Sequence, residues 1–351
     1  MRALELAEMG RMTTWPNPWV GCVVVKNGDI IGEGFHRYRG EPHAEPNAIR
    51  NCKIDPHDAD VYVTLEPCSH YGLTPPCCEL LNSKKVKRVY VALEDPDEKV
   101  KGRGIRFLND NGIETIVGLC RKEVERSMRP YLHHRLTGMP FVVCKVACGL
   151  NGNISCIDNS SQWITGDAAR SDVHKLRAES QAVMVGIGTV LADNPKLTVR
   201  GEFATKIKAQ PLRVILDPSG KSLSSKELNI HDEVQAPSLI VTSNGDVPDG
   251  ASVFKMPDNA FDMKLLLAHL GKRGILQVLV EGGAETWTRL IEDGLVNQMV
   301  IYQAPKIMKG KNFFHGLRPS SIKDVTNWKL ESSSVLGEDI KIELTPPSCI
   351  I

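Results

Sequence analysis

Two segments restrict the possible folds of this 351-residue chain more than any others: "HAE" at residues 43–45 and "EPCSHYGLTPPCC" at residues 66–78. They contain a histidine, a carboxylate and cysteines, which are the side chains that bind zinc in proteins or act beside it. Side chains so far apart along the chain can share one ion only where two elements end at the same point. We therefore expect a compact fold in which these segments meet.

The pattern supplies a complete set of groups for hydrolytic zinc chemistry. His43, Cys68 and Cys77 offer one imidazole nitrogen and two thiolates, which leaves a fourth tetrahedral position for water. Zinc lowers the pKa of such a water, so that hydroxide is available at cellular pH. Glu45 is placed to carry protons from the water to a departing amine. Histidine, glutamate and a Pro-Cys with a second cysteine are typical of zinc nucleobase deaminases.

Two features of the cysteine segment leave part of this interpretation open. Eight residues separate Cys68 from Cys77, where the usual pattern has two. We expect this insertion to form part of a substrate pocket. Cys78 is an alternative third ligand, but Pro75-Pro76 would present Cys77 to the metal as the first residue of a helix.

Composition narrows the class of partner. The 43 basic residues nearly balance the 42 acidic residues, so no global field attracts nucleic acid or anionic membrane. No apolar run approaches the ~20 residues that span a bilayer. The ten cysteines are scattered, with no secretory signal, which argues against a disulfide framework. We expect a cytoplasmic homo-oligomer that acts on small molecules, without nucleic-acid or membrane partners.

Alternating apolar runs predict two α/β domains. In the first, two strands joined by Asn27-Gly28 form a hairpin, and further strands alternate with helices. A polar helix over about 120–137 follows, so we place the domains at residues 1–138 and 139–351. The second domain starts again with a strand at "PFVVCKVAC", then a helix for which Thr165 is the expected cap.

The first domain resembles the deaminase half of the bifunctional riboflavin-biosynthesis deaminase–reductase family. The matching segments are "PNPWVGCVVV", "GEPHAEPNAI", "VTLEPCSHYGLTPPC" and "DPDEKVKGRG". The resemblance implies a cytidine-deaminase-like α/β/α fold and removal of an amino group from a phosphoribosylamino-pyrimidine. It also implies that Asn17 and His70 contact this substrate.

Two departures from that family concern the substrate phosphate. Leu73 stands where the family usually has lysine or arginine, and Asp97-Glu98 stands where it usually has Asn-Pro. Losing a cation and gaining anions near a phosphate should weaken binding. Either Lys101 or Arg103 substitutes for the lost cation, or the deaminase is impaired.

The second domain contains glycine-rich turns between strands and helices, at "VGIGTVLADNPKLTVR" and "VEGGAETW". Such turns let backbone N–H groups approach a phosphate, although most only turn the chain. Together with "KVACGLNG" and "SSQWITGDAARSDVHKLRAES", they resemble the family's reductase half, a dihydrofolate-reductase-like domain that uses NADPH.

Residue roles in the second domain follow from this resemblance. The implied cofactor-binding residues are Ala147, Trp163, Thr165, Thr189, Asp193, Gly282, Gly283, Ala284 and Glu285. The implied substrate-binding residues are Lys145, Ser161, Arg177, Leu197, Arg200 and Glu281. We expect Arg177 and Arg200 to clamp the ribose phosphate through bidentate hydrogen bonds. The alternatives for these arginines are a solvated helix face and a strand end, and for Trp163 ordinary core.

Three other functions remain as alternatives. A nucleic-acid or nucleoside deaminase is one, for which "KKVKR" at residues 84–88 is the only basic cluster near the zinc motif. A structural zinc protein is another, but such sites normally have four protein ligands and no adjacent acid. The third is a reductase whose deaminase domain is impaired.

Overall fold

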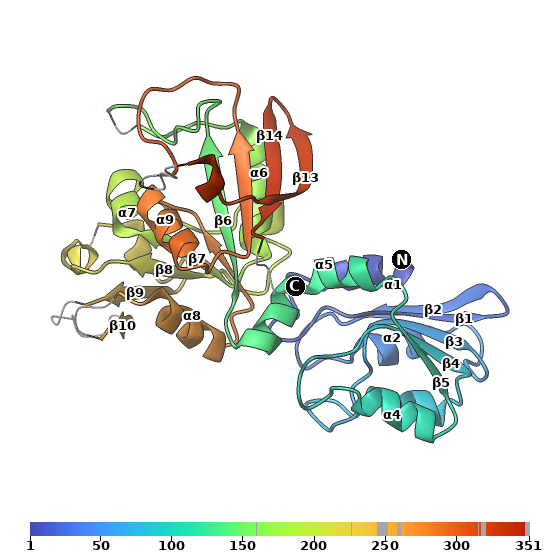
Figure 1. The fold of residues 1–351 in the computed structure, drawn as a ribbon. Helices are drawn as coiled ribbons and strands as arrows, with labels where there is room; N and C mark the ends of the chain where they lie inside the picture. Colours follow the sequence, from blue (N-terminus) through green and yellow to red (C-terminus); the bar gives the residue numbers. More distant parts are fainter. Residues whose placement is uncertain are drawn as a thin grey trace. The chain divides into compact units, whose positions relative to one another are not determined.

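The computed structural model describes residues 1–158, 160–225, 227–243, 252–257, 261–314, 316 and 321–347. The chain forms two compact units, Met1–Gly138 and Met139–Ile350. Each unit is built around its own sheet, with helices against it (Figure 1).

The first unit contains a five-stranded sheet in the order β2-β1-β3-β4-β5. β1 pairs antiparallel with β2 and β3, whereas β3, β4 and β5 run parallel. Asn27 and Gly28 have φ angles of 54° and 89°, so they form the hairpin turn that the sequence predicts. The strands are β1 Gly21–Lys26, β2 Asp29–Phe35, β3 Asp60–Leu65, β4 Arg88–Leu93 and β5 Glu114–Val117.

The helices of this unit cover the sheet and bring the zinc motif together. Val61, Val63, Val89 and Val91 of the central strands form a core with Leu81 of α3 and Leu108 of α4. The carboxyl end of β3 is buried, and so are Glu66 and Pro67, which lead from it to Cys68. The helices are α1 Arg2–Glu8, α2 Ala44–Arg50, α3 Cys77–Ser83, α4 Arg103–Asp110 and α5 Arg121–Thr137.

Within the described residues, the second unit has a nine-stranded sheet in the order β10-β9-β8-β7-β11-β6-β12-β14-β13. The strands from β10 to β12 run parallel, and β14 and β13 add an antiparallel edge. The strands are β6 Phe141–Cys148, β7 Ala182–Gly186, β8 Leu212–Leu216, β9 Ser238–Thr242, β10 Val253–Lys255, β11 Gln277–Val280, β12 Gln298–Gln303, β13 Lys329–Leu336 and β14 Asp339–Thr345.

Helices cover both faces of this sheet, which explains why β6 is an almost continuous apolar run. Phe141 and Val143 pack against α6, whereas Val142, Cys144 and Val146 pack with α8 and α9 on the other face. The helices are α6 Asp167–Ala178, α7 Ile187–Asp193, α8 Met263–Lys272 and α9 Ala284–Glu292, with short 3-10 turns at Gly201–Phe203, Lys221–Ser224, Asn229–His231 and Ile322–Asp324.

One detail of the predicted helix over 166–180 is wrong. Thr165 does not cap α6; the N-cap residue is Gly166, which has no side chain to do so. Instead, the Gly166 N–H donates to the carboxylate of Asp339, 2.8 Å away at the start of β14. The cap is therefore supplied from a distant part of the chain.

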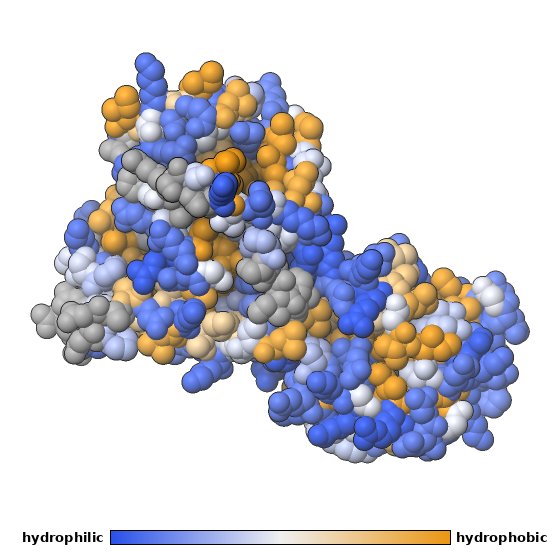
Figure 2. Space-filling view, viewed as in Figure 1, coloured by the Kyte–Doolittle hydropathy of each residue, from blue (hydrophilic) through white to orange (hydrophobic). Residues whose placement is uncertain are grey.

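Much of the visible surface is hydrophilic (Figure 2), as expected for a chain in which 24% of the residues are charged. Figure 2 shows hydrophilic side chains over much of the visible face, with small hydrophobic patches between them. Among the described residues, no helix has both the length and the apolar character needed to cross a bilayer.

Candidate active sites

Three side chains from separate elements of the first unit converge on one point. His43 immediately precedes α2, Cys77 is the first residue of α3, and Cys68 follows β3. Their ligand atoms lie within 4.8 Å of one another, with His43 Nδ1 3.5 Å from Cys68 Sγ and 3.4 Å from Cys77 Sγ. Tetrahedral zinc with bonds of roughly 2.0 and 2.3 Å would separate such atoms by about 3.5 Å. The spacing therefore fits a zinc ion.

The neighbouring cysteine lies elsewhere. The Cys78 side chain is fully buried in the apolar core, against residues such as Val61 and Leu81. Its backbone N–H donates to the Cys68 carbonyl at 3.2 Å, which holds the start of α3 against the loop. The structure thus brings Cys77, and not Cys78, together with the other two ligand atoms.

The surroundings of Cys68 favour its thiolate form. A hydrogen bond from the Cys77 thiol, together with His43, lowers the pKa of Cys68 to about 4. Thiolate is the form of cysteine that binds metal. Glu45, in the first turn of α2, is only 3% exposed. Burial and the nearby Cys68 raise the pKa of Glu45 to about 7.

These groups open onto a cavity of about 380 Å³. His43, Glu45 and Cys68 line it, and so do Asn17 and His70, the two residues that the family resemblance implies for the substrate. The cavity is therefore lined by two of the three metal ligands, a buried carboxyl group and polar side chains that can recognise a small molecule.

His36 is a further residue of this cavity that the sequence reasoning missed. Its Nε2 lies 3.2 Å from Asn17 Nδ2, and its Nδ1 lies 3.3 Å from the Pro42 carbonyl oxygen. Burial lowers the pKa of His36 to about 4, so the ring is neutral. Nδ1–H then donates to Pro42, and Nε2 accepts from Asn17. The only signal in the sequence is a histidine placed between a strand and the zinc motif.

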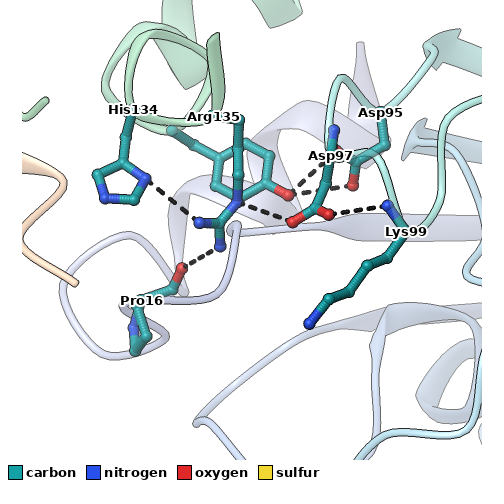
Figure 3. Close-up of polar contacts among 7 residues, drawn as sticks. Pro16, Asp95, Asp97, Lys99, His134 and Arg135 are labelled. Carbon is teal, nitrogen blue, oxygen red and sulfur yellow. Dashed lines mark hydrogen bonds and ion pairs between the residues drawn. The ribbon is translucent and has the colours of Figure 1, made fainter. Parts of the chain in front are cut away.

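A second missed group links the cavity to α5 (Figure 3). The Tyr131 hydroxyl lies 3.1 Å from each carboxylate oxygen of Asp95, and Arg135 Nε lies 3.1 Å from Asp97 Oδ2. Burial raises the pKa of Asp95 to about 6. Arg135 also stacks on the Tyr131 ring and donates to the Pro16 carbonyl at 3.3 Å. The charge of Asp97 is thus neutralised within the protein.

The second unit contains two adjoining cavities, of about 490 and 560 Å³. They share Ser161, Thr189, Asp193 and Gly283 as lining residues. The first cavity is also lined by Lys145, Ala147, Trp163, Thr165, Arg177, Leu197, Arg200 and Glu281, and the second by Ala284 and Glu285. The fold therefore gathers residues from six separate segments around one hollow.

Gly282 is the one residue of the implied set that lines neither cavity. It has a φ angle of 126°, which favours glycine, and a Cβ placed on it would lie 3.1 Å from the Trp287 ring. It shapes the turn before α9. Trp163 is not core, because it is 63% exposed and Arg170 stacks on its ring at 4.7 Å.

The Arg177 guanidinium already has partners within the protein. It donates two hydrogen bonds to Glu281, one of them at 2.8 Å, and a third to the Thr198 carbonyl at 2.9 Å. Both side chains of the pair are largely buried, with 11% and 8% of their side-chain surface exposed. Burial raises the pKa of Glu281, but Arg177 outweighs this effect and lowers the pKa to about 2. The expected bidentate contacts of Arg177 are thus made to Glu281, whereas the exposed Arg200 forms no ion pair with any described residue.

Comparisons with known proteins agree with this division of the chain. Residues 1–93 match the family model described as "Cytidine and deoxycytidylate deaminase zinc-binding region", and residues 140–342 match "RibD C-terminal domain". Among solved structures, a diaminohydroxyphosphoribosylaminopyrimidine deaminase/5-amino-6-(5-phosphoribosylamino)uracil reductase of Thermotoga maritima is 36% identical, with a TM-score of 0.89. The match covers 98% of this chain and 97% of that one. Fold and site together define a zinc-binding deaminase joined to a reductase.

Curated relatives extend over almost the whole chain. Riboflavin biosynthesis protein RibD of Chlamydia pneumoniae is 42% identical, over 98% of this chain and 94% of its own length. The Escherichia coli RibD is 37% identical, over 98% of this chain and 97% of its own length. The chain belongs to the RibD family of bifunctional deaminase–reductases of riboflavin biosynthesis.

Proposed function

We propose that this chain deaminates 2,5-diamino-6-(5-phosphoribosylamino)pyrimidin-4(3H)-one and then reduces the resulting 5-amino-6-(5-phosphoribosylamino)uracil with NADPH. The observation that carries the first reaction is the convergence of His43, Cys68 and Cys77, with His43, Cys68 and the buried Glu45 lining one cavity. The two activities in the name of the Thermotoga maritima protein support the choice of substrates.

In the first reaction water is consumed, the ring C–N bond to the amino group breaks, and ammonia leaves. His43, Cys68 and Cys77 would hold the ion. When bound, zinc acidifies water, so that a nucleophile is available near neutral pH. Glu45 takes the proton of the attacking water and returns it to the departing amino group. Asn17, oriented by His36, and His70 would orient the ring and ribose.

In the second reaction bound NADPH would supply a hydride for C1′ of the ring-opened imine form of the ribose, and the imine nitrogen would take a proton. The product carries a ribityl chain, and NADPH becomes NADP⁺. Thr189, Asp193 and the turn from Gly282 to Glu285 would hold the cofactor, with Ala147, Trp163 and Thr165. Lys145, Ser161, Leu197 and Arg200 would hold the substrate. The protein contributes chiefly positioning and electrostatics.

The Arg177–Glu281 pair has a positioning role in this proposal. Its buried charges are satisfied by each other, so neither has to be neutralised by the substrate. Lys145 lies near enough for Glu281 to raise its pKa, although burial lowers it overall. Together these residues give one wall of the cavity a fixed arrangement of charges.

Substitution of Glu45 tests the first reaction. We expect Glu45→Gln to retain zinc, because His43 and both thiols are unchanged, and to reduce deamination by at least about 10²-fold. NADPH-dependent reduction should be unchanged, since no residue of the second unit is altered. Metal analysis and separate assays of the two reactions measure this. Loss of both activities together would contradict two independent sites.

A further inference from the structure

The outer edge of the metal-site cavity presents an apolar side chain to a substrate that carries a phosphate. Leu73 lines the cavity, is 73% exposed and has no charge with which to bind an anion. A phosphate monoester carries a charge of about −1.5 to −2 near neutral pH. If the deaminase of the proposed function is active, other groups of the cavity must bind this charge.

Apart from Glu45, the acidic residues that line the cavity are already engaged inside the protein. Glu66 accepts hydrogen bonds from the backbone N–H groups of residues 95, 102, 104 and 105, at 2.9 to 3.2 Å. Asp95 accepts from Tyr131, and Asp97 is paired with Arg135 (Figure 3). Their negative charges are therefore compensated before a phosphate arrives.

Three lysine and arginine side chains line the cavity: one forms an ion pair within the protein, and two form none with the described residues. Arg135 is engaged with Asp97, with the Pro16 carbonyl and with the Tyr131 ring. Arg39 and Lys99 also line the cavity, and neither forms an ion pair with any residue that the structure describes. Lys101 and Arg103, the substitutes expected from the sequence, do not line it.

Arg39 and Lys99 line the same cavity as Leu73. Arg39 precedes Gly40, and a Cβ placed on Gly40 would lie 3.9 Å from Leu73 Cδ1, so this loop borders Leu73. The Lys99 N–H donates to Asp97 Oδ1 at 3.0 Å, which fixes its backbone. Figure 3 shows the Lys99 side chain extending away from the Asp97 carboxylate. Asp97 thus positions the Lys99 backbone and does not neutralise the charge of the Lys99 side chain.

We propose that Arg39 and Lys99 bind the phosphate of the deaminase substrate, and that they replace the cation that position 73 lacks. This inference rests on the proposed deamination and adds the residues that make it selective for a phosphorylated pyrimidine. Arg39 offers a planar fork of donors and Lys99 a point charge, a combination suited to a phosphate group. Asp97 and Arg135 act as positioning residues.

The test compares the phosphorylated substrate with its dephosphorylated riboside, using the zinc-loaded full chain. We expect Arg39→Gln and Lys99→Gln each to raise the KM for the phosphorylated substrate about tenfold, with kcat little changed. The KM for the riboside should not change. Leu73→Lys should lower the KM of the unaltered chain and restore part of the affinity lost in the double variant.

Two substitutions serve as controls. Arg37→Gln removes an exposed cation from the same loop as Arg39; the Arg37 side chain stacks on Phe35 and does not line the cavity. Its KM should be that of the unaltered chain. Lys101→Gln tests the residue that the sequence suggested, and we expect no change. The rate of NADPH-dependent reduction, measured on the same preparations, reports whether each variant is folded.

Three outcomes would contradict the inference. One is a double Arg39→Gln, Lys99→Gln variant that keeps the normal KM and the preference for the phosphorylated form. Another is a larger effect at Lys101 than at Lys99. The third is a chain that deaminates neither form, which would also overturn the proposed function, whereas the first two leave that function standing.

Discussion

His174 lies on the wall of the reductase cavity, where its Nδ1 accepts a hydrogen bond from the Arg200 backbone N–H at 3.2 Å. Burial, together with the charges of Arg177 and Arg200, lowers the pKa of His174 from 6.5 to about 4. Glu281 opposes this shift but does not reverse it. The folded protein therefore keeps His174 neutral at pH values where the unfolded chain binds a proton.

This difference predicts a pH dependence of stability. Between pH 6.5 and pH 4 the unfolded state binds the extra proton, so the free energy of unfolding falls as the pH falls. We expect His174→Asn, which keeps an acceptor for Arg200 but cannot titrate, to lose less stability between pH 7 and pH 5. Calorimetric unfolding at the two pH values measures this, with the exposed His57→Asn as control. Equal losses in His174→Asn and the unaltered chain would show that His174 is not responsible.

The zinc motif predicted the metal ligands, because the chemistry requires those residue types in one place. The sequence did not predict which side chains form ion pairs with one another. Arg177 and Glu281 are separated by 104 residues, and the sequence of either segment carries no sign of their ion pair. The family resemblance placed both at the substrate, and the structure places both at the cavity. Only the structure shows that the guanidinium is already engaged.

The start of α6 depends on the hairpin formed by β13 and β14. The Gly166 N–H has no side-chain acceptor within its own helix terminus, and Asp339 at the start of β14 supplies one. Asp339 is buried, and a carboxylate near a helix N-terminus also interacts favourably with the helix dipole. Thr165, immediately before this point, lines the proposed cofactor cavity. The edge hairpin therefore helps to fix one wall of the active site.

Removal of this cap should weaken the second unit. We expect Asp339→Ala to lower the free energy of unfolding by about 1–2 kcal/mol, the usual cost of losing an N-cap. The KM for NADPH should rise, because the segment at Thr165 loses an anchor. Denaturant unfolding and steady-state reduction measure the two effects. Asp339→Asn, which keeps an oxygen acceptor, should lose less, and an equal loss in both variants would argue against the capping role.

The hairpin of β13 and β14 could not be predicted from the pattern of apolar residues along the sequence. Buried strands such as β6, β7 and β11 were predicted from their apolar runs, but β13 and β14 were not. β13 is largely exposed and contains three serines, so it carries little of the alternation that predicts a strand. β14 pairs with β12 at the edge of the sheet, and β13 pairs with β14. The position of β13 thus depends on this sheet edge.

Taken as a whole, the molecule keeps its two reactions in separate units. The metal ligands, Glu45 and the proposed phosphate-binding residues all belong to the first unit, and every residue proposed for reduction belongs to the second. Each unit has its own sheet and apolar core. This organisation explains why loss of one chemistry should leave the other intact.

Removal of zinc from the purified chain tests this account most directly. Product analysis follows the diaminopyrimidine nucleotide and the deaminated uracil nucleotide, each with and without NADPH, before and after chelation. We expect one zinc per chain, no conversion of the diaminopyrimidine after chelation, and full reduction of the supplied uracil nucleotide. A chain that purifies without zinc yet deaminates, or that loses reduction when zinc is removed, would contradict this account.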